Sequence, residues 1–99
     1  MEWSRQREAD LVSHCVQVAR CDSAPASRDD ADVCRLSAQL VRTRYPEASR
    51  NLTAAADAYF FSHGGKPRPF TEVVEAGLMT DLPRLRHLME NALAGVRSW

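Results

Sequence analysis

The sequence contains no long run of apolar residues, no isoleucine and a single lysine, Lys66. Because no stretch approaches about 18 uncharged apolar residues, the sequence excludes a membrane-spanning helix. It carries no excess charge of either sign, since 13 basic residues balance 13 acidic ones, and this balance argues against a general binder of polyanions. The scarcity of lysine and isoleucine beside abundant arginine and alanine is typical of GC-rich coding and favours a bacterial source.

Cysteine is also scarce, with residues only at Cys15, Cys21 and Cys34. An odd number of cysteines in a short chain argues against a disulfide framework, because one thiol would be left over. The N-terminal segment MEWSRQREADL carries charges where a signal peptide needs an apolar run. We therefore expect a reduced, cytoplasmic protein that is not associated with a membrane.

What is present indicates one small helical domain. The 99 residues fit a single domain, and an apolar fraction of 44% without net charge is too high for a disordered chain. Apolar residues recur at helical spacing, and no segment shows the alternation typical of a strand. We predict an all-α fold, a single-domain bundle of four main helices plus one short helix that spans residues 1–99.

Apolar stripes and turn residues predict where these helices lie. The predicted helices cover residues 3–21, 28–45, 46–63, 71–78 and 82–96. Ser27 precedes three aspartates in a helix-start pattern, and Pro46 suits the first position of the third helix. Gly64 and Gly65 can supply the left-handed residues that end many helices.

No pattern indicates catalysis or metal binding. A metal site drawn from His14, Cys15, Cys21 and Cys34 fits badly, because Cys21 lies six positions after Cys15, with five residues between them, whereas structural zinc sites usually have two to four. A nucleophilic cysteine would need a base such as His14, His63 or His87, and no family signature surrounds any of them. We expect no catalytic residue, no metal and no cofactor. Thiol-based metal sensing stays a third hypothesis, which predicts zinc or copper in the purified protein.

DNA binding is the alternative function. Residues 71–93 have the layout of a helix-turn-helix, with Arg84, Arg86 and His87 on the recognition helix. Two features oppose it: Pro83 stands where the second helix usually packs an aliphatic residue, and the domain is neutral, whereas phosphate binding is typical of a domain with a basic face. The sequence therefore disfavours nucleic acid as a partner.

Protein recognition is the favoured function, because a neutral helical bundle without a catalytic signature works through its surface. The acidic run after Ser27 would attract a basic partner electrostatically. An exposed aromatic residue followed by a basic loop offers a second contact. The predicted partner-binding residues are Asp29, Asp30, Asp32, Phe61, His63, Lys66 and Arg68. The sequence leaves open whether the protein is a monomer or a homodimer.

The C-terminal half carries a resemblance to a known family. Residues 44–48 (RYPEA), the helix after them, residues 75–78 (EAGL) and residues 81–85 (DLPRL) resemble small helical immunity proteins, which neutralise NAD-hydrolysing toxins delivered by type VI secretion. The resemblance covers roughly residues 40–95 and departs from the family at the glycine- and proline-rich turn of residues 64–69. It implies a cytoplasmic inhibitor that covers the active cleft of a cognate toxin, and it assigns no individual binding residue.

Overall fold

The computed structural model describes residues 5–69, 71–72 and 82–95. Over these residues it contains four helices and no strand, so the predicted all-α fold is confirmed. The helices are α1 (Arg5–Ala19), α2 (Arg28–Val41), α3 (Pro46–His63) and α5 (Leu82–Ala94). The short helix expected at residues 71–78 lies mostly outside the described residues. None of the described helices is long and apolar enough to cross a lipid bilayer.

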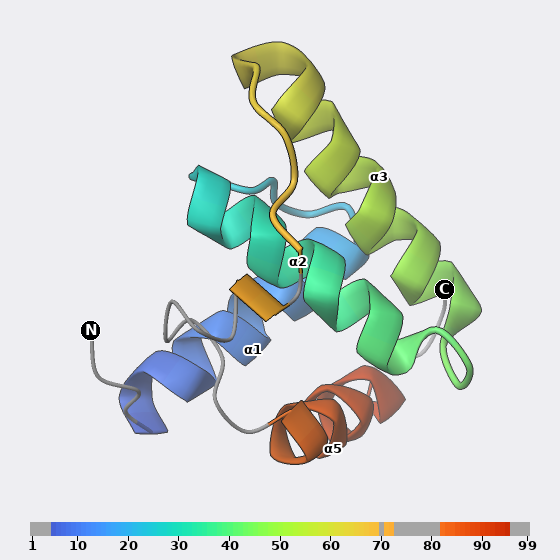
Figure 1. The fold of residues 1–99 in the computed structure, drawn as a ribbon. Coiled ribbons are helices and arrows are strands. Elements are labelled where there is room, and N and C mark those ends of the chain that lie inside the picture. The colour runs from blue at the N-terminus through green and yellow to red at the C-terminus, as the bar shows by residue number, and fades with distance from the viewer. Residues whose placement is uncertain (1–4, 70, 73–81, 96–99) are drawn as a thin grey trace.

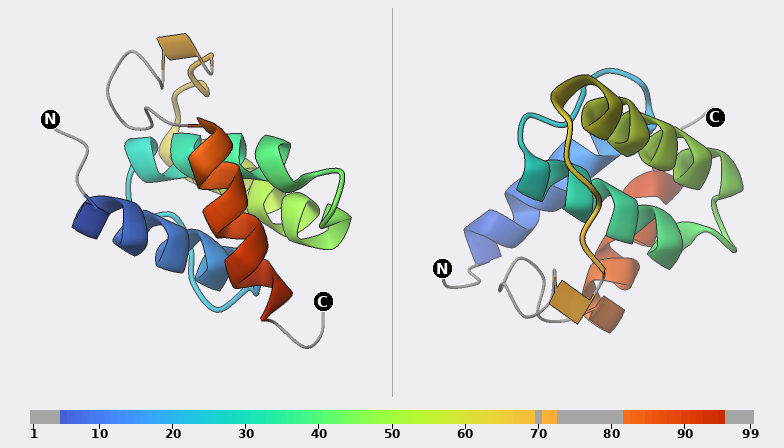
Figure 2. Two further views of the ribbon diagram at one scale, coloured as in Figure 1. Left: turned by 90° about the horizontal axis from the view of Figure 1, so that it is seen from below. Right: turned by 45° about the horizontal axis from the view of Figure 1, so that its top comes forward.

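Helices α2 and α3 form an antiparallel pair with the most extensive contact among the described helices (Figure 1). Helix α1 packs on α3, and α5 crosses both α1 and α2 (Figure 2). By contrast, α1 contacts α2 sparsely. The core between the helices is built from the predicted apolar stripes, and its larger fully buried side chains include Val18, Val33, Val41, Leu52, Leu85, Met89 and Leu93.

The predicted ends of α2 and α3 are confirmed where a capping residue sets them. Ser27 is extended, with φ −152° and ψ 169°, and its hydroxyl accepts a hydrogen bond from the backbone N–H of Asp30 at 3.1 Å. Pro46 opens α3, where its missing N–H costs nothing. Gly64 ends α3 with φ 76°, and its N–H donates to the carbonyl of Phe60.

Helix α1 ends two residues earlier than we expected, because Cys21 turns the chain. Cys21 adopts φ 63°, the left-handed region that disfavours side chains with a Cβ. Its N–H donates to the carbonyl of Val18, and the N–H of Asp22 donates to the carbonyl of Gln17. These two bonds form a Schellman motif with a cysteine where glycine is usual.

Two other boundaries also differ from the prediction. Helix α2 ends at Val41 instead of near Tyr45, although the N–H of Tyr45 still donates to the carbonyl of Val41 at 2.8 Å. The chain thus makes one further turn before Pro46. Helix α5 ends at Ala94, and Val96 lies outside the described residues.

Candidate functional site

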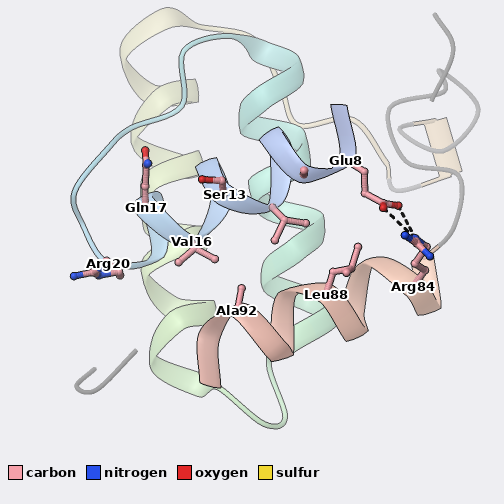
Figure 3. Close-up of a pocket in the computed structure, with 10 residues that line it drawn as sticks. Glu8, Ser13, Val16, Gln17, Arg20, Arg84, Leu88 and Ala92 are labelled. Carbon is pink, nitrogen blue, oxygen red and sulfur yellow. Dashed lines mark hydrogen bonds and ion pairs between the residues drawn. The ribbon is translucent and has the colours of Figure 1, made fainter. Parts of the chain in front are cut away.

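A groove open to solvent runs between α1 and α5 and has a volume of about 670 Å³ (Figure 3). Helix α5 lines it with every fourth residue, and α1 lines it mainly with adjacent pairs that recur every four residues, as expected for one face of an α-helix. Its lining comprises Glu8, Ala9, Val12, Ser13, Val16, Gln17, Arg20, Arg84, Leu88 and Ala92.

The groove has an apolar centre and charged ends. Val12 and Val16 of α1 face Leu88 and Ala92 of α5, and all four are only partly buried. Figure 3 shows Glu8 and Arg84 at one end and Arg20 at the other. This distribution leaves a partly exposed apolar strip between two polar boundaries.

An ion pair closes one end of the groove and joins the two helices. The Nε of Arg84 lies 3.0 Å from both carboxylate oxygens of Glu8, so one N–H is shared between them. The Glu8 side chain is buried, whereas the Arg84 side chain is 42% exposed. Arg84, which the helix-turn-helix hypothesis assigned to DNA, is thus held in an intrachain ion pair.

The opposite end carries an exposed cation. Arg20 lies 3.6 Å from a carboxylate oxygen of Asp22, and both side chains are more than half exposed. An exposed ion pair of this kind contributes little to stability, so the Arg20 guanidinium is readily available to another anion.

Outside the groove, the structure joins three of the predicted partner-binding residues to one another. The segment after α3 runs back across α2 (Figure 1). Through this return the Nε of Arg68 donates to Asp32 at 2.6 Å, and its Nη2 donates to Asp29. The Asp32 side chain is 1% exposed, and hydrogen bonding to Asp32 raises the pKa of the Arg68 guanidinium. Arg68 and the two aspartates, predicted as separate contacts for a partner, therefore neutralise one another within the chain.

The remaining aspartate of the acidic run, Asp30, belongs to a different cluster. One carboxylate oxygen of Asp30 lies 2.7 Å from the Nε2 of His14 on α1. The other oxygen lies 4.0 Å from the Sγ of Cys34, one turn further along α2. Hydrogen bonding with Cys15, burial and the negative charge of Asp30 raise the pKa of the Cys34 thiol. A thiol held in its neutral form is a poor nucleophile, so the cluster does not resemble a cysteine–histidine catalytic pair.

The last three predicted residues are exposed at the end of α3 and in the loop that follows. The Phe61 side chain is 93% exposed. The ring of His63 stacks on Tyr59 with centroids 4.1 Å apart, and Lys66 is exposed. The end of α3 lies at the opposite side of the molecule from α5, so the structure does not bring these residues to the groove (Figure 1).

Sequence reasoning missed the groove, although a signal for it exists. Glu8, Val12, Val16 and Arg20 follow one another at intervals of four residues, beside the core stripe that contains Cys15 and Val18. The helical spacing of the apolar residues places Val12 in the predicted core stripe of residues 3–21 and Leu88 in that of residues 82–96. Only the packing of α5 on α1 shows that these two side chains lie at the edge of the core.

Comparisons with models of protein families, with curated protein sequences and with solved structures found no match.

Proposed function

We propose that the chain is a non-catalytic protein-binding module whose α1–α5 groove receives an amphipathic helix of a partner protein. The observation that carries the proposal is the partly exposed apolar strip of Val12, Val16, Leu88 and Ala92 between charged ends. Helix-in-groove recognition uses an apolar face laid into such a strip.

The length and charge of the groove specify the partner segment. The 12 residue steps from Glu8 to Arg20 correspond to about 18 Å along a helix, which accommodates about three turns of a bound helix. Glu8 is neutralised by Arg84, whereas Arg20 is only weakly paired. The partner helix should therefore present apolar residues at i, i+4 and i+7 and an acidic residue, or its C-terminal end, toward Arg20.

The resemblance of residues 40–95 to immunity proteins supports a more specific proposal for the partner. The partner is then a bacterial toxin, and the chain blocks its activity by covering it in a stoichiometric complex. The resemblance includes α5, which forms one wall of the groove.

Titration calorimetry with the product of the neighbouring gene tests the proposal. The wild-type chain should bind this protein in a 1:1 complex, and Val16→Glu or Leu88→Glu should weaken binding by about 30-fold or more, as expected for the centre of an interface. Circular dichroism checks that each variant remains folded.

Phe61→Ala is the matched control, because it removes a large exposed side chain outside the groove. It should leave the dissociation constant within about threefold of wild type, as expected outside an interface. Loss of binding in Phe61→Ala with full binding by the groove variants would place the interface at the end of α3 and refute the groove. Failure of the wild-type chain to bind its neighbour would refute the toxin partner.

A further inference from the structure

Three side chains with different metal-ligating atoms converge where α1 passes the start of α2. They are His14 of α1 and Asp30 and Cys34 of α2, and one nitrogen, one oxygen and one sulfur atom lie within 4.8 Å of one another. Asp30 and Cys34 are four residues apart, so they occupy the same face of α2. The third group comes from a different helix, which is why spacing along the sequence does not reveal the set.

We propose that His14, Asp30 and Cys34 bind a zinc ion. This inference is independent of the proposed function, because none of the three residues lines the groove. A mixed set of imidazole, carboxylate and thiolate donors suits Zn²⁺, whereas Mg²⁺ and Ca²⁺ prefer oxygen donors alone.

The distances are compatible with a tetrahedral ion after small side-chain shifts. Zinc bond lengths of about 2.0 Å to nitrogen and oxygen and about 2.3 Å to sulfur place tetrahedral ligands about 3.3–3.5 Å apart. The observed separation between the His14 Nε2 and an Asp30 oxygen is 2.7 Å, and that between the other Asp30 oxygen and the Cys34 Sγ is 4.0 Å. Both separations lie within about 1 Å of this range, so small side-chain shifts are all that these two distances require.

The surroundings of the His14 Nε2 atom support the same metal site. Its Nε2 is buried, and despite its closeness to Asp30 it makes no aligned hydrogen bond to any residue that the structure describes. Buried polar atoms are normally satisfied, and a metal ion would satisfy this one.

The Asp30 carboxylate is already held in place. The backbone N–H of Ala26 donates to one of its oxygens at 2.7 Å. Hydrogen bonds of this kind orient ligating carboxylates in metal sites. The Cys34 thiol, neutral in the metal-free chain, would lose its proton on binding, because a coordinating thiol is deprotonated.

A bound ion would join two helices that contact each other sparsely. Because the unfolded chain does not hold the three ligands together, metal binding stabilises the folded state. The site is therefore a clamp between α1 and α2.

Cobalt titration of the chelator-treated full-length chain tests the proposal, because a Co²⁺–thiolate bond produces charge-transfer absorption. The wild-type chain should bind one Co²⁺ with this absorption, release it to Zn²⁺ and melt at a higher temperature with Zn²⁺ than with EDTA. His14→Gln and Asp30→Asn should weaken binding by at least about tenfold, the lower limit found even for outer-shell partners of a metal. His14 is partly exposed, so His14→Gln should fold even if Cys34→Ser does not.

The matched controls are Cys21→Ser and His63→Gln, which remove an exposed thiol and an exposed imidazole outside the cluster. Both should bind Co²⁺ as the wild type does. Absence of thiolate absorption in the wild type, its loss in Cys21→Ser, or unchanged affinity in both His14→Gln and Asp30→Asn would overturn the site.

Discussion

At the scale of single residues, the acidic run shows how position within a helix decides the role of a charge. Asp29, Asp30 and Asp32 look equivalent in sequence, yet their side chains point in different directions around α2. Asp32 points into the protein and meets Arg68, Asp29 remains more than half exposed, and Asp30 faces His14. A buried carboxylate requires a cation, because its desolvation is otherwise uncompensated.

Replacing Arg68 by alanine should therefore lower the free energy of unfolding by about 3 kcal/mol, since it leaves Asp32 buried without its cation. This value is the lower end of the range for a broken buried pair, because the Arg68 side chain is 21% exposed and its backbone N–H still donates to Asp32. Urea denaturation followed by circular dichroism measures the change. Asp29→Asn, which removes the exposed partner, should cost less than about 1 kcal/mol. Equal effects of the two substitutions would contradict the assigned burial.

At the scale of helices, capping residues predict the ends of a helix well when nearby residues satisfy the hydrogen-bonding groups of the terminal backbone. Ser27, Pro46 and Gly64 each mark a boundary that the structure contains. The end of α1 was missed because no glycine or asparagine marks it: Cys21 takes the left-handed conformation instead. Two backbone hydrogen bonds of the Schellman motif compensate for the unfavourable dihedral angles.

Cys21→Gly should consequently raise the free energy of unfolding by about 0.5–1 kcal/mol. Relief of the left-handed strain, about 1–2 kcal/mol, exceeds the added entropy of glycine in the unfolded chain. Cys21→Ala is the matched control, because it removes the same exposed thiol and keeps a Cβ; it should change stability by less than about 0.5 kcal/mol. Thermal melting under reducing conditions compares the two, and a stabilisation shared by alanine would assign the effect to the thiol.

At the scale of the whole molecule, α2 and α3 make the most extensive contact among the described helices, while α1 packs on α3 and α5 packs on α1 and α2. Leu52 of α3 is completely buried, whereas Phe61, nine residues later on the same helix, is almost completely exposed. A domain of this size has a net stability of about 5–10 kcal/mol, so the loss of one large core side chain removes a substantial part of it.

Leu52→Ala should lower the free energy of unfolding by about 2–5 kcal/mol, because it removes buried apolar atoms and leaves a cavity. Phe61→Ala should change it by less than about 0.5 kcal/mol, since an exposed side chain makes few contacts in the folded state. Urea titrations monitored by circular dichroism and by intrinsic fluorescence should give coincident, single transitions for both. Comparable losses in the two variants would contradict the core described for α3.

The sequence by itself determined the helices and most of their buried faces. Periodic apolar residues give each helix one face that must leave water, and local capping groups fix many of the ends. The predicted stripe of α3 is the clearest example. Four of its members are buried, Ala48, Leu52, Ala56 and Phe60, whereas Ala55 and Tyr59 are partly buried and His63 at the end of the helix is exposed. The apolar face and the ends of a helix depend on residues within a few positions of one another along the chain.

Only the tertiary structure decided which side chains from different helices meet. Arg68 reaches Asp32 because the segment after α3 returns across α2, and His14 reaches Asp30 because α1 passes the start of α2. The groove exists because α5 packs on one side of α1 and leaves part of two apolar stripes uncovered. Such juxtapositions depend on helix packing, and helical periodicity fixes the faces of a helix without fixing its partner.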